Sequence, residues 1–574
     1  MSDLHSRERE AKFKVAPDTH PTLFAQPVAF DGYTRQEIGV VDQTDTYFDT
    51  AAYELLRQGI ALRLRHNGAR HEVGIKSIHA TRKGAIQERM DVAIALPAEA
   101  SPFDATTWPA AVDEQLVAYA VKAKKLYPVL VVRQSRQKAK LLPAATDSPL
   151  AEWSLDTVWL EQVRNISPHA ASKQDNEQLE LKFHELELEL LPNGAGAGDG
   201  NDARVDAFDA LVRETQARFD LVPLFASKFV RGVEAEIARA HGNAQRIAPT
   251  MTLAAACRLL LHQQVFQILL HEHLARQQES VRKSARAIHT MRVAIRRSRA
   301  ILHLYQSVLP TVQAHLAQGE TAQEETAQVQ SIIKGLRRLG RKLGYVRDLD
   351  VALANLRAFR RGQPESLQKG LKLLRGELRS RRKEAHADLL LLLDSKKHRK
   401  FIVRCLDFCR TPETAQHTVV PSGDQVSPSQ VRHTLPSRIL AAFEAVRAYE
   451  TVITPTNQPP LATFHALRIE TKYLRYLLEF TEDLLGNAGE ALIDQLRLLQ
   501  EHLGALNDAH VEQARLQQWR TASTVDAALC EAIDARLDDI ATTLATLTAA
   551  TNTKLNALVN SASRATLATA LAWL

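Results

Sequence analysis

Charged and apolar residues alternate at every second position in several stretches of the first half of the chain. In residues 8–15, Glu8, Glu10, Lys12 and Lys14 share one parity, and the residues between them are mainly apolar. Because successive side chains of a strand point to opposite faces, this pattern predicts a strand with one charged face. The same reasoning predicts strands at residues 8–15, 44–49, 59–66, 71–77, 86–95, 129–135, 151–159 and 178–190.

The predicted strands carry more charge on one face than an exposed sheet needs. Glu185, Glu187 and Glu189 share one face of the last strand, and Arg63 and Arg65 share one face of another. Like charges at this spacing repel, and an edge strand needs only one or two charges. A dry interior cannot hold so many charges, so the pattern predicts a closed antiparallel barrel whose wet lumen takes metal and phosphate. The alternative is a set of amphipathic strands with solvated charged faces.

Farther along the chain, the apolar spacing becomes that of helices. It predicts an amphipathic helix at residues 204–219, a linker at residues 241–251 and a helical region at residues 252–574. We therefore expect an α+β multidomain fold. An eight-stranded antiparallel tunnel in residues 1–240 precedes an all-α domain of two related bundles, near residues 252–408 and 437–574. Residues 411–436, rich in Pro, Ser and Thr, are expected to connect the bundles irregularly.

An internal repeat in the helical half places basic residues at the same spacing twice. The series His289, Arg292, Arg296 and Arg299 recurs as His465, Arg468, Lys472 and Arg475. Positions i, i+3, i+7 and i+10 lie within about 80° of a helix surface and span about 15 Å. Arg337 and Arg341 lie on a further basic helix face. Aligned cations favour a linear polyanion as ligand, and the alternative is again a solvated face.

A second shared pattern follows each basic series. Leu343-Gly344-x-x-x-Asp348 matches Leu503-Gly504-x-x-x-Asp508 in residue order and spacing. We interpret Asp348 and Asp508 as structural partners that orient the arginines.

The formal net charge of +7 is unevenly divided along the chain. Residues 1–250 contain 30 Lys and Arg against 35 Asp and Glu, whereas residues 251–574 contain 43 against 31. The first part is therefore acidic, at −5, and the second basic, at +12, as metal and polyanion binding would require.

Other features of the sequence narrow the setting. There is no run of 18 uninterrupted apolar residues and no apolar signal-peptide core near the N-terminus, so no membrane segment is expected. Four unpatterned cysteines suit a reducing cytoplasm. With 6% aromatic residues, nucleic acid is a low-ranked partner, since Tyr473 and Tyr476 are the few candidates for base stacking.

The first 235 or so residues resemble a CYTH domain, the triphosphate tunnel metalloenzyme fold. The resemblance depends on Glu8-x-Glu10-x-Lys12, Tyr47-Phe48-Asp49-Thr50, Leu62-Arg63-Leu64-Arg65, Lys76, Arg89-x-Asp91, Glu185-Leu-Glu187-Leu-Glu189 and Ser227-Lys228-x-x-Arg231-Gly232. It implies an eight-stranded tunnel that hydrolyses inorganic or thiamine triphosphate, or cyclises ATP, with Mg²⁺ or Mn²⁺.

The same resemblance implies roles for individual residues. The metal ligands would be Glu8, Glu10, Asp156, Glu185 and Glu187. The residues that grip the triphosphate would be Lys12, Arg63, Arg65, Lys76, Arg89, Arg133 and Lys228. The family usually has Arg-x-Glu-x-Glu where this chain has Arg89-x-Asp91-x-Ala93. The shorter Asp91 and the non-ligating Ala93 put a second metal ion in doubt.

The helical half resembles a CHAD domain, the conserved-histidine α-helical domain. The residues that carry the resemblance are His289-x-x-Arg292-x-x-x-Arg296-Arg297-x-Arg299 and Val346-Arg347-Asp348-Leu349-Asp350-Val351. It implies inorganic polyphosphate binding through the basic helix faces, by His289, Arg292, Arg296, Arg299, Arg337, Arg341, His465, Arg468, Lys472 and Arg475.

Together these features predict a metal-dependent inorganic triphosphatase that also binds polyphosphate, in the cytoplasm and at polyphosphate granules. Three alternatives stay open: another reaction on the same tunnel, such as adenylyl cyclase or thiamine triphosphatase; a polyphosphate-binding protein without activity; and nucleic-acid binding by the basic half.

Overall fold

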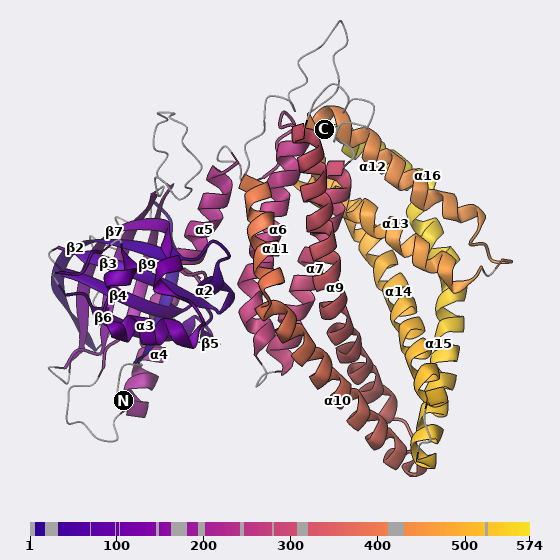
Figure 1. The fold of residues 1–574 in the computed structure, drawn as a ribbon, viewed down its shortest axis with the longest axis horizontal. Coiled ribbons are helices and arrows are strands. Elements are labelled where there is room, and N and C mark those ends of the chain that lie inside the picture. Colours follow the sequence, from indigo (N-terminus) through magenta and orange to yellow (C-terminus); the bar gives the residue numbers. More distant parts are fainter. Residues whose placement is uncertain are drawn as a thin grey trace, which may run out of the picture. The chain divides into compact units, whose positions relative to one another are not determined.

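The computed structural model divides the chain into two compact units, Met1–Asn243 and Ala244–Leu574. It describes residues 6–17, 32–68, 70–97, 99–102, 104–144, 148–161, 181–192, 201–241, 246–277, 281–306, 320–410, 430–457, 459–522 and 526–574. The first unit is built from strands and the second from helices (Figure 1). The predicted α+β fold class is therefore confirmed.

Eight antiparallel strands close into a barrel in the first unit. Going round the barrel, the order is β1 (Ser6–Val15), β9 (Leu181–Leu190), β8 (Ala151–Glu161), β7 (Tyr127–Pro143), β2 (Tyr33–Asp49), β3 (Ile60–Asn67), β4 (Arg70–Ser77) and β6 (Ile86–Ala95). Pairing of β1 with β6 closes the ring, with Glu8 opposite Arg89. Two short strands, β5 (Thr81–Lys83) and β10 (Val222–Pro223), extend it.

The apolar core of this unit lies outside the barrel wall. Apolar side chains of β1, β8 and β9, among them Phe13, Trp153 and Leu186, pack with residues of α4 (Asn201–Arg218) such as Phe208. A second cluster joins β3, β4 and β6 to α3 (Ala110–Ala118). Because the apolar parity faces these helices, the charged parity of the same strands faces the lumen.

Strands β2 and β7 are longer than the sequence pattern predicts. The predicted segment of β2, residues 44–49, is the buried end of that strand. The rest of β2, residues 33–43, is largely exposed and polar, and it pairs with β7 across a register shift between Glu37 and Gly39. Backbone pairing between β2 and β7 extends both strands into a two-stranded ribbon. The hydrophobic pattern of the sequence could not predict this extension, because it does not record backbone pairing.

Short helices connect the barrel strands. Helix α2 (Glu54–Arg57) follows β2, and the Asp49 carboxylate accepts the backbone N–H groups of Thr50, Leu55 and Leu56 at 2.7–3.0 Å. The Tyr47-Phe48-Asp49-Thr50 motif thus has a structural role, because Asp49 satisfies amides that the short helix leaves unpaired. Helix α5 (Lys228–Arg239) ends the unit, and Ser227 caps its N-terminus through a bond from the Val230 amide.

Long helices form the second unit. The first bundle contains α6 (Leu253–Arg276), α7 (Val281–Gln306), α9 (Glu320–Arg360), α10 (Glu365–Asp394) and α11 (Lys396–Arg410). The second contains α12 (Val431–Arg447), α13 (Leu461–Phe480), α14 (Glu482–Ala522), α15 (Ala527–Val559) and α16 (Ser561–Leu571). The predicted irregular segment, residues 411–436, is wrong at its end, because α12 starts at Val431 and contains Pro436. Residues 411–429 lie outside the described part of the chain.

Helix α6 alone, among the described residues, is long and apolar enough to cross a membrane. Its apolar window is 72% buried, and the helix packs against α7 and α11 (Figure 1). Its apolar character is that of a central helix within the first bundle.

Two glycines of α10 provide a matched test of helix packing. A Cβ at Gly370 would lie 1.9 Å from the Ala528 carbonyl oxygen of α15, whereas one at Gly376 would have no neighbour within 4 Å. We expect Gly370→Ala to lower the free energy of unfolding by about 1–3 kcal/mol, because backbone must move. Gly376→Ala should raise it by up to about 1 kcal/mol, because alanine favours helix. Denaturant unfolding followed by circular dichroism measures both; equal effects would contradict this packing.

Candidate functional site: a charged tunnel and facing basic helices

Register places the predicted acidic residues of β1 and β9 side by side inside the barrel. Glu10 lies opposite Glu189 and Lys12 lies opposite Glu187. The side chains of Glu10, Glu185 and Glu187 are almost fully buried. An ionised carboxylate is stable in such a place only beside cations or strong hydrogen-bond donors. The barrel interior supplies such cations from β1, β3, β4, β6 and β7 and from α5.

Asp156, Glu185 and Glu187 form an acidic cluster at one level of the tunnel. Among the described residues they are the one group of at least three His, Cys, Asp or Glu side chains whose possible ligand atoms all lie within 4.8 Å of one another. Asp156 comes from β8, where it lies opposite Glu185 of β9. An all-carboxylate set of this kind suits a hard divalent cation such as Mg²⁺ or Mn²⁺.

Lys228 reaches this acidic cluster from the first turn of α5. Its Nζ lies 2.7 Å from Asp156 Oδ2, 2.9 Å from Glu185 Oε1 and 3.0 Å from Glu187 Oε1. Burial alone would lower the pKa of Lys228, but the three carboxylates outweigh it and raise that pKa. One ammonium therefore holds together acidic groups from two strands.

A second charged cluster lies along β1, β4 and β6. Lys76 Nζ is 2.6 Å from Glu8 Oε2 and 2.8 Å from Asp91 Oδ2, and Glu10 pairs with Lys12 and Arg89, each at 3.1 Å. Burial would raise the pKa of Glu8, but Lys76, Lys12 and Arg63 lower it to about 2. The Glu8 carboxylate is therefore charged at neutral pH.

Asp45 organises a third group, which contains both predicted arginines of β3. Arg65 donates to Asp45 from Nε at 2.8 Å and from Nη2 at 2.9 Å, and Arg63 Nη1 lies 3.6 Å away. Gln134 Nε2 donates to the same carboxylate at 2.9 Å. Asp45 is fully buried, and the two arginines lower its pKa despite that burial. The pattern did not identify Asp45, although it shares parity with Tyr47 on β2.

Arg133 is a correction to the predicted site. Its side chain is 58% exposed and pairs with Glu161, on the outer face of the wall. Arg136 of the same strand lies inside instead, 2.9 Å from Asp156 and 2.5 Å from Glu187. The two residues have opposite parity, so they face opposite sides. Gln134 has the same parity as Arg136 and also faces the lumen, where it donates to Asp45. This polar residue was the sequence signal that could have favoured Arg136 over Arg133.

Two further residues, neither of them among the predicted site residues, shape the tunnel. A Cβ at Gly74 would lie 2.8 Å from Arg63 Nε, so glycine leaves the space that this guanidinium fills. Glu189, the third acidic residue of β9, lies near Glu8 and Glu10; burial and the Glu8 charge raise its pKa to about 7. Asp91 and Ala93 stand where the CYTH family usually has two glutamates. Asp91 pairs with Lys76, and Ala93 lies opposite Gly74 on β4.

In the helical unit, the two repeated basic series lie on helices that face each other. His289, Arg292, Arg296 and Arg299 lie on α7, and His465, Arg468, Lys472 and Arg475 lie on α13. Contacts between these helices include Arg297 Nη2 with Glu479 Oε2 at 2.6 Å and the His303 ring against the Tyr473 ring. The Arg296 guanidinium lies 5.9 Å from the Tyr476 ring centroid. Arg337 of α9 lies near Arg299, and Arg341 is exposed on the same helix.

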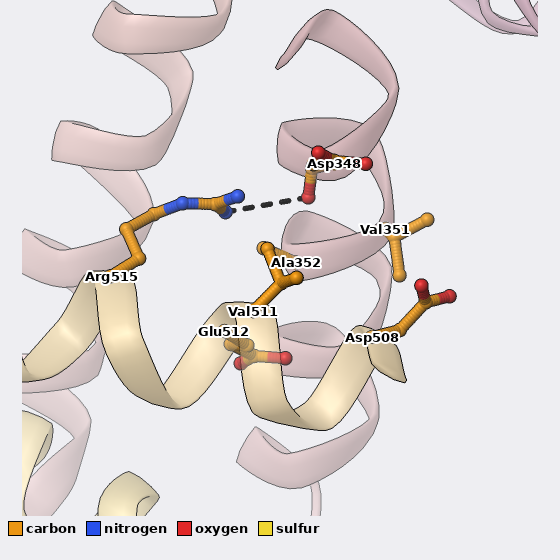
Figure 2. Close-up of a pocket in the computed structure, with 7 residues that line it drawn as sticks. All are labelled: Asp348, Val351, Ala352, Asp508, Val511, Glu512 and Arg515. Atoms are coloured by element: carbon orange, nitrogen blue, oxygen red, sulfur yellow. Dashed lines mark hydrogen bonds between the residues drawn. The ribbon is translucent and has the colours of Figure 1, made fainter. Parts of the chain in front are cut away.

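The Leu-Gly-x-x-x-Asp segments of α9 and α14 contact residues of the two basic series. Arg292 Nη1 donates to the Gly344 carbonyl at 2.9 Å and to Asp348 Oδ1 at 3.2 Å, while His465 Nδ1 lies 3.1 Å from Asn507 Oδ1. Asp348 of α9 and Asp508 of α14 line a small cleft between the two bundles (Figure 2). Figure 2 also shows Arg515 beside Asp348, whose backbone carbonyl accepts a bond from Arg515 Nη1 at 3.4 Å.

Comparison with known proteins assigns both halves of the chain. The model of the CYTH domain matches residues 6–202, and the model of the CHAD domain matches residues 264–517. A search of the curated proteins found no match.

Several solved structures are similar to parts of the chain. The CHAD domain from the plant Ricinus communis is 21% identical to this chain and has a TM-score of 0.41. The match covers 55% of this chain and 94% of the Ricinus chain. PptA from Streptomyces chartreusis is 18% identical, with coverages of 54% and 99% and a TM-score of 0.40. A Hippeastrum protein, described as an adenylyl cyclase candidate with a dominant triphosphatase activity, is 16% identical, with coverages of 39% and 95% and a TM-score of 0.27. On the two family matches, this chain contains a CYTH domain at residues 6–202 and, after it, a CHAD domain at residues 264–517.

Proposed function

We propose that the tunnel hydrolyses inorganic triphosphate to pyrophosphate and phosphate with Mg²⁺ or Mn²⁺. The observation that carries this proposal is the lumen itself, where buried carboxylates face buried and partly buried cations, and all eight barrel strands and α5 contribute to the set. The cations are Lys12, Arg63, Arg65, Lys76, Arg89, Arg136 and Lys228. Such a set matches a linear ligand that carries several negative charges and is accompanied by divalent cations.

The residues present fit a divalent metal ion. Asp156, Glu185 and Glu187 offer only carboxylate oxygens, within 4.8 Å of one another. When bound, a divalent ion supplies positive charge that stabilises the phosphate oxygens and the attacking oxygen. The metal role of Glu8 and Glu10 stays a prediction, because these two residues are not part of this carboxylate cluster.

The tunnel cations position the substrate in this proposal. Each ammonium or guanidinium already contacts a carboxylate oxygen, and a phosphate oxygen is an equivalent anionic acceptor. Arg65 and Arg63 are held by Asp45, so their donors are oriented before the substrate enters. Phosphoryl transfer needs positioning and charge stabilisation more than covalent help from the protein, and a prearranged ring of donors supplies both.

We also propose that the helical unit binds inorganic polyphosphate. The basic series of α7 and α13 face each other, and the pKa values of Arg296, Arg299 and Arg468 are lowered by burial and by neighbouring arginines. Cations that repel one another this closely favour an anion that bridges them. Such binding would raise the substrate concentration near the tunnel and place the enzyme at polyphosphate granules in the cytoplasm. Nucleic acid remains a lower-ranked ligand, and competition at matched salt separates the two.

Metal binding can be measured without turnover. We expect Glu187→Gln to weaken Mn²⁺ binding at least about tenfold, because one carboxylate ligand is lost from the cluster. Titration followed by electron paramagnetic resonance gives the affinity directly. Glu161→Gln is the matched control, since Glu161 lies on the outer face and pairs with Arg133. Equal affinities of the two variants would place the metal elsewhere.

Activity separates the inner arginine of β7 from the outer one. Arg136→Met is expected to lower kcat/KM for inorganic triphosphate on the order of a hundredfold or more, and Arg133→Met to leave it within about twofold. Phosphate release should be assayed with triphosphate, long polyphosphate, ATP and thiamine triphosphate in parallel. Preference for ATP or thiamine triphosphate would favour the other tunnel reactions, and no release from any of them would favour a binding protein without activity.

Polyphosphate retention tests the helical unit. The double variant Arg292→Glu with Arg468→Glu reverses one charge on each facing helix and should abolish retention on immobilised polyphosphate. The matched control is Arg497→Glu with Arg520→Glu, because these exposed arginines pair with Asp494 and Asp534 instead. Unchanged retention by the first double variant would refute the proposed binding face.

A further inference from the structure

Lys472 occupies a special position in the facing basic series. It stands in the second repeat where the first repeat has Arg296, and it is the lone lysine among the six arginines and lysines of the two series. Its side chain is half-buried and forms no hydrogen bond or ion pair with any residue in the described part of the chain. The two repeats therefore differ in one chemically important respect at their centre, because an ammonium loses its proton far more readily than a guanidinium.

The surroundings of Lys472 are strongly cationic. Arg468 lies one turn before Lys472 on α13 and Tyr476 one turn after it, so the three side chains share one helix face. The Arg296 guanidinium of α7 lies 5.9 Å from the Tyr476 ring centroid, on the same face. Arg292 of α7 and Asp508 of α14 are also near enough to act electrostatically on Lys472. Asp508 also faces Arg468, so its single negative charge is shared. A charged Lys472 would place a fourth positive charge among three guanidinium groups that stay protonated at any physiological pH.

These contacts weaken the charged form of Lys472. Burial lowers the pKa of Lys472, and Arg296, Arg468 and Arg292 lower it further, to about 6, with only partial compensation by Asp508. The nearby His289 is also less basic than usual, because burial and Arg347, Arg292 and Arg296 lower its pKa. The Tyr476 ring lies beside Arg296, with its centroid 5.9 Å from the guanidinium carbon. Lys472 is thus the group whose charge a bound anion can restore.

We propose that Lys472 couples polyanion binding to proton uptake: it is a neutral amine in the empty site and takes one proton from solvent when a phosphate chain binds. This inference rests on the proposed polyphosphate binding. The negative charge of the chain offsets the three guanidinium groups, so the ammonium form becomes the stable one. The N–H bond forms on Nζ, and the proton comes from water or buffer.

The sign of the pH dependence follows from the two states. Below the pKa of the empty site, Lys472 is already charged and contributes no pH dependence. As pH rises from about 6 toward the higher pKa of the occupied site, binding must add a proton, so affinity falls by up to about tenfold per pH unit. A guanidinium at the same position would give no such fall. Acidification would therefore strengthen retention of the polyanion.

Calorimetry of the full chain with inorganic polyphosphate measures this proton directly. Titrations at about pH 7.5, one pH unit or more above the empty-site value, in two buffers of different ionisation enthalpy give the number of protons taken up per site. We expect the unmodified chain to take up close to one more proton than Lys472→Arg. Lys472→Arg should also bind more tightly than the unmodified chain at alkaline pH and depend less on pH. The histidines are common to both proteins, so the difference reports Lys472.

Two further variants complete the test. Lys472→Met, which is always neutral, should bind weakly and without this proton uptake. Lys372→Arg on the exposed face of α10 should behave as the unmodified chain, since it makes the same change outside the cluster. Equal proton uptake and equal pH dependence in the unmodified chain and Lys472→Arg would overturn the inference while leaving polyphosphate binding intact. Absence of binding by the folded, unmodified chain at every pH would overturn the proposed binding and this inference together.

Discussion

Mutual neutralisation of buried charges inside the barrel is the interaction on which the first unit depends. Asp45 and Asp156 are fully buried and Glu185 is nearly so, and each contacts at least one arginine or lysine. Removing one partner from a buried pair costs about 3–5 kcal/mol, because the other charge is then left uncompensated. The barrel wall can carry these residues because its apolar parity is packed under α3 and α4 on the outside. The same arrangement leaves a polar lumen whose anions and cations are already in place for metal and phosphate.

The helical unit uses the opposite arrangement. Carboxylates in the tunnel have cationic partners, whereas Arg296, Arg468 and Lys472 lie close enough to repel one another across two helices. Asp508 offsets only part of this repulsion, at Arg468 and Lys472. Repulsion within this cluster favours occupation by an anion. In the proposed function, the compensated tunnel acts on a polyanion and the basic cluster of the helical unit holds it.

Much of this organisation could be predicted from the sequence. Period-two charge patterns identified the strands and put Glu8, Glu185 and Lys76 on lumen-facing positions, and the repeated basic spacing identified α7 and α13. The pairing of partners could not be predicted in the same way. Lys228 reaches Asp156 from 72 residues away, and Gly74 matters only because Arg63 crosses it. Such contacts depend on tertiary placement and not on local periodicity.

The error at Arg133 has a similar origin. Arg133 and Arg136 have opposite parity, so they face opposite sides of the strand. The predicted strand, residues 129–135, ended before Arg136. The strand in fact runs to Pro143 through ribbon pairing with β2, so Arg136 is still within it and faces Asp156. The length of β7 is determined by backbone pairing with β2, and both strands are partly polar. A hydrophobic pattern therefore cannot predict where β7 ends.

A crystal structure of the full chain with Mn²⁺ and a non-hydrolysable triphosphate analogue would test the central claim most directly. Anomalous scattering locates the manganese. The account predicts a manganese peak inside the barrel, bounded by Asp156, Glu185 and Glu187, with Lys228 and Arg136 on phosphate oxygens. Manganese and analogue outside the barrel, with those carboxylates still paired only to Lys228 and Arg136, would contradict it.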